Sequence, residues 1–409
     1  HAKLPNNDFS ASPENQLCSF AQHSLFLTTP KFKFKEKTLE VFEMNCSYNW
    51  YNEPENQTVC LDKDFLSKLT LSCINQINAN SQERKIKELK KYGLAKVSIK
   101  KWLYGYSYGG IEISNLMKMC DFLRLPYNSL NGKFLFMGQL GKKSKIKTFI
   151  KPKFPINLSI PEIGTIIGAQ ASDASLNPRG WFYYNNKEEL RNKISNTIQK
   201  IFGNVQSMLL FDIFKRKYAL QFPAIVARAI NFLEIPYGRK TIQNYSLPKI
   251  LMNGPLQMQS NYFAQRYSDE GSIRLIKDGR DRWHLFCYQA IDLNPVLDKK
   301  EIDKLKYIII KKGRLKSTPS KTKFKVYSKI SNLKEFKIKN YKPNFLLDEQ
   351  ILLKNFGIKS HLMLTKVKYY FKTDKLSAYW QSVVYDQKDI LKFYKYVGFN
   401  DFEKNRKLE

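Results

Sequence analysis

Two stretches of this chain end in the same way, with an apolar run that closes in a carboxylate. The first is IGTIIGAQASDASL at 163–176 and the second is LQMQSNYFAQRYSDEGSI at 256–273. Their acids, Asp173 and Glu270, stand 97 positions apart, and each precedes a small residue and a β-leaning segment. An acid at the C-terminal end of a helix faces the negative end of the helix dipole, which costs free energy unless a cation lies there. Two such ends predict a pair of carboxylates gathered around a metal ion, although either acid taken alone fits a solvated helix end without function.

The charge of the chain points to a polyanionic partner. Among 409 residues, 69 Lys and Arg face 36 Asp and Glu, a formal net charge of +33, while 43% hydrophobic residues suffice for real cores. A basic surface gains free energy when it releases counterions from a phosphate backbone. A membrane partner would need a basic amphipathic helix or an apolar span of about 18 residues, and the sequence has neither. Nucleic acid is therefore the expected partner, with no membrane contact.

The cysteines do not form a recognisable metal or disulfide pattern. Six of them are scattered along the chain without a CxxC pair or an adjacent histidine: Cys18, Cys46, Cys60, Cys73, Cys120 and Cys287. This spacing is typical of ordinary thiols in a reducing compartment. We therefore expect a cytoplasmic, nucleoid-associated protein without structural zinc.

Residues 61–130 are predicted to form a small helical domain after an N-terminal segment, 1–60, to which no role can be assigned. A helix that ends near Gly93 is followed by a short helix at 96–104 and by a long apolar helix stopped at Pro126. This order resembles repressor-type helix-turn-helix domains, in which the second helix enters the major groove. Lys100 and Lys101, with Ser98, would then face DNA, while Ile99, Trp102 and Leu103 fill the core. A helical bundle with solvated lysines remains the alternative.

A basic segment at 131–157, rich in Gly, Lys and Pro, is expected to connect this domain to a duplicated region. Residues 158–255 and 256–409 each predict a motif helix, two strands, a helix, two strands and a final helix. In the first half, a strand is expected to end and a helix to begin at Asn185 and Asn186, and that helix ends at Gly203. The two halves correspond in pattern, with little residue identity.

Seven segments of 158–409, taken in order, resemble the single-chain LAGLIDADG homing endonucleases. They are FPINLSIPEIGTIIGAQASDASL, NNKEELRNKISNTIQKIFG, FLEIPYGRKTIQNYSLPKIL, YFAQRYSDEGSI, LLKNFGI, SAYWQSVVY and FYKYVGFNDFEKNRKL. Together with the helical domain in front, the chain is similar to the archaeal type with an N-terminal helix-turn-helix. The resemblance implies an α+β fold in which two pseudo-symmetric αββαββα halves form a β-saddle. It also implies a monomer with internal pseudo-twofold symmetry.

In this family the two motif helices pack side by side, which requires small residues. Gly168, Ala169 and Ala171 meet that requirement in the first motif, where Ala174 replaces the usual Gly. The second motif departs from it with Gln265 and Arg266. Because an unpaired buried guanidinium is costly, we expect Arg266 to point toward solvent or DNA, or the helices to pair less closely.

The last acid of each motif in the family binds a divalent ion near a scissile phosphate. Asp173 and Glu270 hold these positions, as metal ligands and catalytic groups for Mg²⁺ or Mn²⁺. Asp269 beside Glu270 leaves an ambiguity of one residue, and Glu270 is preferred because Gly271 follows it.

The saddle strands of the family enter the major groove of double-stranded DNA, so basic residues on them are candidate DNA contacts. These candidates are Arg179, Lys215, Arg216, Lys217, Arg274, Lys277, Arg280, Arg282, Lys366 and Lys368. Each could equally be a solvated surface charge. The very basic segment 299–342 falls where early strands and loops of the second half are expected, and it fits an extended DNA arm or a disordered insertion.

Three functions are consistent with these features. The first is a magnesium-dependent, site-specific DNA endonuclease, favoured by the retained acids Asp173 and Glu270. The second is a DNA-binding regulator that has kept the fold without cleavage, favoured by the helical domain and by Gln265 and Arg266. The third is an RNA-binding intron maturase.

Overall fold

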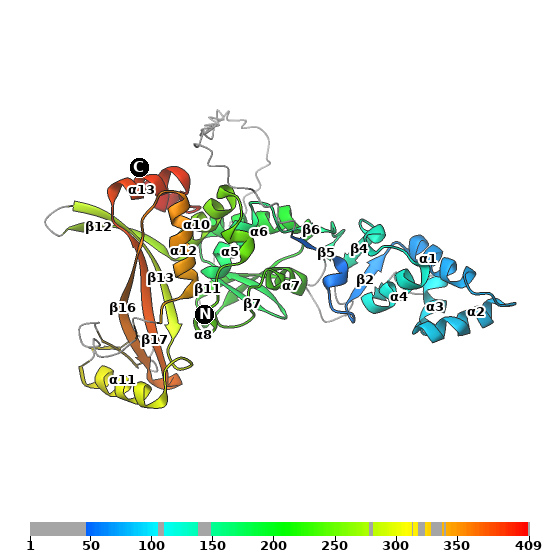
Figure 1. Cartoon of the computed structure of the whole chain (residues 1–409), viewed down its shortest axis with the longest axis horizontal. Coiled ribbons are helices and arrows are strands. Elements are labelled where there is room, and N and C mark those ends of the chain that lie inside the picture. Colours follow the sequence, from blue (N-terminus) through cyan, green and yellow to red (C-terminus); the bar gives the residue numbers. More distant parts are fainter. Residues whose placement is uncertain are drawn as a thin grey trace, which may run out of the picture. The chain divides into compact units, whose positions relative to one another are not determined.

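The computed structural model describes residues 46–104, 110–137, 149–277, 281–312, 314–317, 324–328, 338 and 341–407. These residues belong to one compact unit of the chain, Phe42–Glu409. Helices and antiparallel sheets make up the described part, so the predicted α+β class is confirmed (Figure 1). Residues 1–45 of the N-terminal segment and the candidate Arg280 lie outside the described residues.

The N-terminal part combines four helices with strands. The helices are α1 (Lys63–Asn75), α2 (Gln82–Leu89), α3 (Lys96–Leu103) and α4 (Ile113–Leu123). On α3, Ile99 and Trp102 are buried, whereas Lys100 and Lys101 are exposed, as the sequence predicted. Leu103 is only partly buried. The DNA contact of this helix stays a prediction.

The described residues of the segment 131–157, which was expected to be a basic connector, contain three strands. Strand β4 (Phe134–Met137) pairs with β2 (Thr58–Leu61), and β5 (Phe149–Ile150) joins β4 to β9 (Asn204–Val205). Strand β6 (Ile156–Asn157) pairs with β1 (Ser47–Tyr48). Phe134 and Met137 are buried, and their apolar side chains explain why this part of a basic segment packs into the fold.

The first half has the predicted order of elements. It runs through α5 (Ile163–Ala171), β7 (Ala174–Asn177), β8 (Gly180–Tyr184), α6 (Glu188–Phe202), β10 (Met208–Asp212), β11 (Lys217–Phe222) and α7 (Ala224–Phe232). The strands form a sheet in the order β10-β11-β8-β7. Short helices α8 (Lys240–Gln243) and α9 (Lys249–Met252) lead to the second half.

The second half follows the same order with an insertion. Its elements are α10 (Leu256–Glu270), β12 (Gly271–Lys277), β13 (Asp281–Asp292), α12 (Asn344–Asn355), β16 (His361–Tyr370), β17 (Lys375–Val384), α13 (Gln387–Tyr396) and α14 (Phe402–Arg406). The insertion comprises α11 (Lys299–Lys312), β14 (Arg314–Ser317) and β15 (Phe324–Ser328), and the two strands extend the sheet to the order β12-β13-β17-β16-β15-β14.

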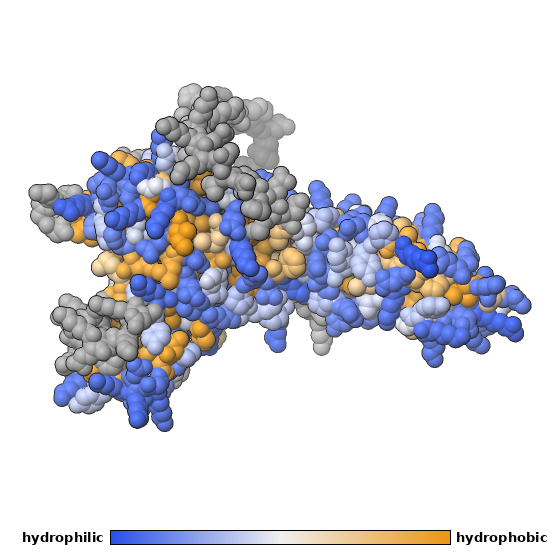
Figure 2. Space-filling model, viewed as in Figure 1, coloured by the Kyte–Doolittle hydropathy of each residue, from blue (hydrophilic) through white to orange (hydrophobic). Residues whose placement is uncertain are grey.

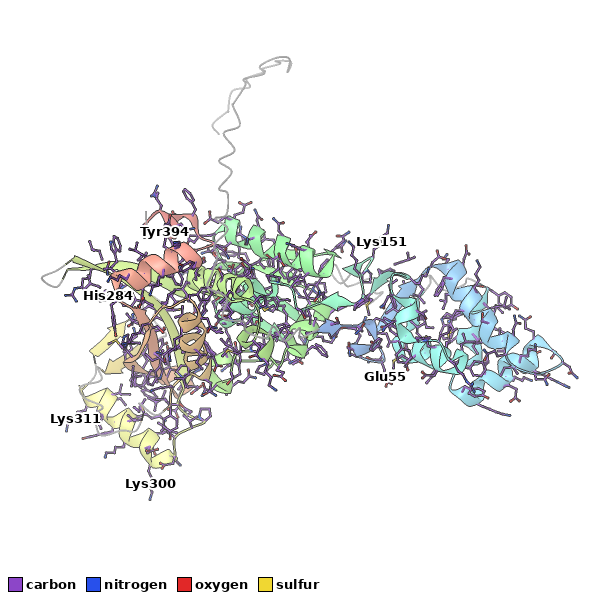
Figure 3. The ribbon with its side chains drawn as sticks, turned by 45° about the horizontal axis from the view of Figure 1, so that its top comes forward. Glu55, Lys151, His284, Lys300, Lys311 and Tyr394 are labelled. Atoms are coloured by element: carbon purple, nitrogen blue, oxygen red, sulfur yellow. The ribbon has the colours of Figure 1, made fainter. Side chains whose placement is uncertain are left out.

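The helix in this insertion corrects the expectation of strands, loops or disorder for the start of 299–342. Leu305 and Ile309 lie four positions apart and are both fully buried, which is the spacing of one helix face. Lys300 and Lys311 stay exposed on the same helix (Figure 3). The sequence of α11 therefore has the apolar period of an amphipathic helix, although lysines separate its apolar residues.

Helices α5 and α10 pack directly against each other (Figure 1). A Cβ added at Gly164 would lie 2.0 Å from the Met258 carbonyl oxygen, and one at Gly168 would lie 2.4 Å from that of Tyr262. Both contacts are with backbone, so only glycine permits this approach. The predicted role of Gly168 is confirmed, Gly164 was missed, and the expectation of looser pairing was wrong.

The face of the molecule seen in Figure 2 shows mainly hydrophilic side chains, with apolar residues in smaller patches between them. Within the described ranges, no helix combines the length and the apolar character needed to cross a membrane.

Candidate acidic centre and nucleic-acid interface

The two acids predicted from the sequence lie at matching ends of the paired helices. Asp173 follows the C-terminal end of α5, and Glu270 is the last residue of α10. Asp173 forms an ion pair with Lys217, whose Nζ lies 3.0 Å from Oδ1. Burial raises the pKa of Asp173, Lys217 opposes that shift, and the charge of Glu270 adds to it. The two carboxylates therefore repel each other across the helix pair.

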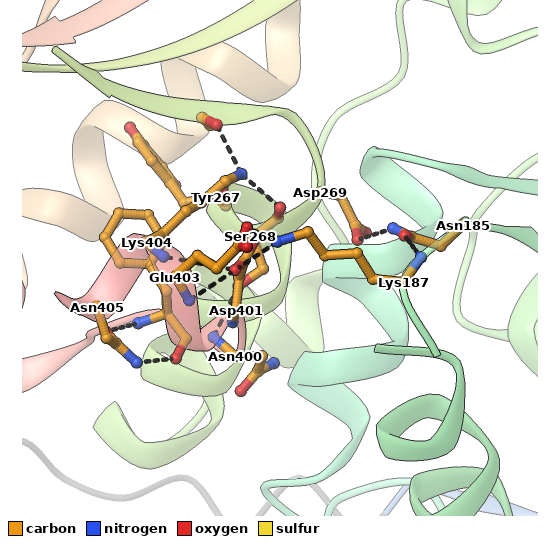
Figure 4. A network of polar contacts seen from close by, with 12 residues as sticks. Asn185, Lys187, Tyr267, Ser268, Asp269, Asn400, Asp401, Glu403, Lys404 and Asn405 are labelled. Carbon is orange, nitrogen blue, oxygen red and sulfur yellow. Dashed lines mark hydrogen bonds and ion pairs between the residues drawn. The ribbon is translucent and has the colours of Figure 1, made fainter. Parts of the chain in front are cut away.

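A lysine lies at the C-terminal end of each of these helices. Lys404 Nζ donates to the carbonyl oxygens of Tyr267, Ser268 and Gly271 at 2.9, 2.5 and 2.7 Å (Figure 4). Lys240 Nζ donates to the carbonyl oxygen of Ser172, just past α5. Burial lowers the pKa of Lys240 to about 8, against the opposing attraction of Glu270. The sequence predicted a metal ion at these helix ends, whereas the structure has a lysine of the chain at each of them.

Asp269 lies in a closed hydrogen-bond cluster. Its carboxylate accepts from Ser172 Oγ and Tyr183 OH, each at 2.6 Å, from Gln265 Nε2 at 3.0 Å and from Asn185 Nδ2 at 3.3 Å. Figure 4 shows the Asn185 contact. Burial raises the pKa of Asp269 to about 7, and the charge of Asp173 contributes, although the hydrogen bonds act in the opposite direction.

Glu270 is the more open of the two neighbouring acids. Its side chain is 33% exposed and pairs with Arg266, whose Nη1 lies 2.5 Å from Oε2. The Asp269 carboxylate already accepts hydrogen bonds from four side chains, whereas Glu270 is partly exposed. Glu270 is therefore better placed to bind a ligand from solution. This arrangement supports Glu270 over Asp269 as the second functional acid.

Arg266 is fully buried and paired, so the expectation that it points to solvent or DNA was wrong. Its Nε donates to Glu349 Oε1 at 3.1 Å and its Nη2 to the Tyr288 carbonyl oxygen at 3.1 Å. Its guanidinium also lies 5.5 Å from the centroid of the Phe345 ring. Two carboxylates and a carbonyl compensate for its burial, which is how the motif accommodates an arginine. Gln265 likewise points inward, toward Tyr183 and Asp269.

Cationic side chains surround a cavity beside Asp173. The cavity has a volume of about 660 Å³, and its walls include Lys215, Lys217, Arg239 and Lys240. Lys215 Nζ lies 3.2 Å from the centroid of the Tyr184 ring, which holds that lysine at the rim. The cavity thus combines four cationic side chains with one carboxylate. Such a surround suits a phosphate.

The register of the larger sheet places several predicted DNA contacts on one face. Residues directly opposite each other in antiparallel strands point to the same side. Arg274 pairs with His284 and Lys366 with Tyr379, and the alternation along the strands adds Arg282 and Lys368 to that face. Lys366 Nζ and Lys368 Nζ lie 5.4 and 4.2 Å from the centroid of the Tyr379 ring.

The remaining candidates are more scattered. Arg216 is exposed in the turn between β10 and β11. Arg179 is exposed and borders a different cavity, of about 460 Å³, beside Arg228 rather than Asp173. The side chain of Lys277 and the whole of Arg280 lie outside the described residues.

Sequence reasoning missed several residues of this centre. Tyr183 donates to Asp269, Arg239 and Lys240 line the cavity of Asp173, and Lys404 donates to carbonyl oxygens at the end of α10. Nothing in their local sequence distinguishes them from other basic or aromatic residues. One signal was available, because Ser172 and Asp269 are separated by 97 positions, as Asp173 and Glu270 are, and they bond to each other.

Comparison with known proteins gives weak similarity in structure alone. No protein-family model and no curated protein matches the sequence. Full-length DUF199/WhiA from Thermatoga maritima matches with 10% identity and a TM-score of 0.31, over 61% of this chain and 58% of that one. This chain thus spans little more than half of that protein. I-DmoI in complex with DNA and Mn matches with 12% identity and a TM-score of 0.28, over 59% of this chain and 98% of that one. Likenesses at this level support no inference about function.

Proposed function

We propose that the chain is a site-specific DNA-binding protein of the LAGLIDADG homing endonuclease type that cleaves double-stranded DNA with a divalent metal ion. The observation that carries this proposal is the position of Asp173 and Glu270. Helix pairing brings these acids, distant in sequence, to one end of the α5–α10 pair, and Asp173 lines a cavity together with four cations. Acids that bind metal and cations that bind phosphate are components of metal-assisted phosphodiester hydrolysis.

Among the described residues, no group of three or more His, Cys, Asp or Glu side chains could hold a metal ion by itself, so Asp173 and Glu270 would bind a divalent cation together with other oxygen ligands. The Lys240 ammonium already occupies a position at the end of α5, on a carbonyl oxygen and under the attraction of Glu270, Asp173 and Asp269. A cation is therefore favoured there, and the lowered pKa of Lys240 eases its replacement. Carboxylate and carbonyl oxygens are ligands that Mg²⁺ and Mn²⁺ accept, with phosphate oxygens and water completing the set.

In this proposal Asp173 and Glu270 hold the ion. When bound, the ion lowers the pKa of a water molecule and neutralises charge on the leaving oxygen. Lys215, Lys217 and Arg239 hold the phosphate backbone against the cavity. Arg274, Arg282, Lys366 and Lys368, on one face of the larger sheet, bind the duplex. Lys100 and Lys101 extend the contact through α3.

Charge-neutralising substitutions test the catalytic part. Asp173→Asn or Glu270→Gln is expected to abolish double-strand cleavage while duplex binding stays within about threefold, because each removes a charge but little volume. The substrate is a duplex recovered from a random library by its binding to the protein, and cleavage is followed with Mg²⁺. Asn177→Asp provides a control that adds an acid to the same cavity without replacing either ligand. Cleavage that persists in both acid variants would exclude this assignment.

A DNA-binding regulator without cleavage is the second candidate, and the pairing of the acids favours it. Lys217 neutralises Asp173, and Arg266 neutralises Glu270, so each carboxylate already has a cationic partner. The regulator would bind its selected duplex tightly, yet neither Mg²⁺ nor Mn²⁺ would produce a nick. That result would replace the nuclease with the regulator while leaving DNA binding intact.

A further inference from the structure

The hairpin formed by β10 and β11 has two apolar residues at its tip, and both are largely exposed to solvent. Ile213 is 76% exposed and Phe214 is 99% exposed. Isolated exposed apolar residues are common on protein surfaces. This pair, however, stands at the tip of a hairpin whose flank exposes Leu209, Phe211 and Tyr218 as well. The hairpin therefore presents apolar surface that its own fold does not use.

The tip has a defined shape. The Asp212 carboxylate accepts a hydrogen bond from the Lys215 backbone N–H at 2.9 Å, which closes the turn around Ile213 and Phe214. Asn186 holds the other side, since its Nδ2 donates to the Arg216 carbonyl oxygen at 3.3 Å and its Oδ1 accepts from the Tyr218 N–H at 3.2 Å. The two side chains are thus presented on an ordered turn, and little backbone entropy remains to be lost when they bind.

The charges next to the tip select the partner. Lys215, Arg216 and Lys217 follow Phe214 directly, and only Asp212 opposes them in the turn. Lys215 and Lys217 also line the cavity of Asp173. A strand of nucleic acid can follow these cations from the tip into the cavity, whereas a flat bilayer cannot enter it. The aromatic tip then meets the same polyanion.

We propose that Phe214, with Ile213 beside it, inserts as a wedge between neighbouring base pairs of bound duplex DNA. Stacked bases are the large apolar surface that duplex DNA offers to an aromatic ring. Apolar wedges of this kind unstack one step and kink the duplex, and adjacent cations hold the bent backbone. The inference rests on the proposed DNA binding, and it holds whether or not the chain cleaves DNA.

Local unstacking provides the direct test. In a duplex selected from a random library, 2-aminopurine replaces adenine at one position at a time, and its fluorescence reports loss of stacking. The wild-type protein is expected to raise the fluorescence at one step only. Phe214→Ala is expected to lose that signal and to bind about tenfold more weakly, in line with the usual contribution of one aromatic–base stack. Phe402→Ala, which removes a phenylalanine that is 69% exposed on α14, is the matched control and leaves both values unchanged.

Three results would overturn the wedge. The first is salt-dependent binding by the wild-type protein with no fluorescence change at any position, which leaves the proposed DNA binding intact. The second is a loss of affinity as large as that of Phe214→Ala when deoxyuridine replaces thymine in the duplex. Such a loss would show that Phe214 contacts the thymine methyl group in the major groove. The third is Phe214-dependent binding to vesicles of anionic phospholipid with a silent 2-aminopurine series. If the wild-type protein binds no duplex at all, the proposed function itself fails.

The Phe214 side chain is almost fully exposed and does not contribute to the core, so Phe214→Ala is expected to leave stability unchanged. Equal melting temperatures of Phe214→Ala and the wild type check this point. The slope of log affinity against log salt should also stay constant, because no charge is removed.

Discussion

At the scale of single residues, the centre of this protein is a balance of buried charges. Arg266 satisfies Glu349 and Glu270, and Lys217 and Lys240 oppose Asp173. Each charge is tolerated because an opposite charge lies close to it. Removing one member should therefore cost more than the pair contributes.

Arg266→Leu is expected to lower the free energy of unfolding by about 3–5 kcal/mol, because it leaves the fully buried Glu349 carboxylate without its cation. The double variant Arg266→Leu with Glu349→Leu should recover most of that loss. Chemical denaturation of the three proteins measures the effect. A double variant no more stable than the single one would show that packing, rather than charge, dominates at this site.

Asp269 predicts a dependence of stability on pH. Its pKa rises from an ordinary 3.8 to about 7 on folding. The stability that it contributes is therefore complete below about pH 4 and is lost as the pH rises to 7. Between pH 5 and pH 8 the melting temperature of the wild type should fall further than that of Asp269→Asn, which has no such titration. Parallel falls in both proteins would place the responsible group elsewhere.

At the scale of elements, the contact between α5 and α10 fixes the position of both acids. The helix backbones approach closely at Gly164 and Gly168, so that their C-terminal ends share one site. Lys404, in the C-terminal segment of the chain, donates hydrogen bonds to carbonyl oxygens at the end of α10 and so fixes the position of that end (Figure 4).

Gly168→Ala is expected to destabilise the protein by about 3 kcal/mol, because its Cβ would lie 2.4 Å from a backbone oxygen that cannot move alone. Gly132→Ala is the matched control. Its φ of +80° costs about 1 kcal/mol for alanine, but nothing lies within 4 Å of the added Cβ. Thermal unfolding of both variants should separate the clash from the backbone strain, and equal losses would contradict the close approach of the helices.

At the scale of the whole molecule, the net charge of +33 is distributed over elements that share one proposed partner. Helix α3, the cavity of Asp173 and one face of the larger sheet each present exposed or partly buried cations. Because binding to phosphates releases counterions, affinity for duplex DNA should fall steeply with salt.

The double variant Lys100→Ala with Lys101→Ala tests whether α3 joins this surface. Its slope of log affinity against log salt should become shallower by about 2, one for each phosphate that the variant no longer neutralises. Lys68→Ala, at an exposed position on α1, is the control and should leave the slope unchanged. An unchanged slope in the double variant would assign those lysines to solvent.

The sequence by itself determined the main elements of the two halves and their order outside the insertion. Apolar periodicity marked α5, α10 and the strands after them, and the burial of Ile99 and Trp102 followed from helical spacing. These features are local, since a residue's neighbours along the chain decide the period of its element. Lysine-rich composition concealed the period of α11, which is why that helix was not expected.

Only the tertiary structure decided which charges meet. Lys240 reaches the end of α5 from 68 positions away, Arg266 meets Glu349 across 83, and Lys404 reaches Tyr267 across 137. A lysine that caps a distant helix has the same local sequence as one in solvent. The partner of a buried charge depends on which distant segment packs beside it. Tertiary packing decides this, and no single segment of the sequence contains it.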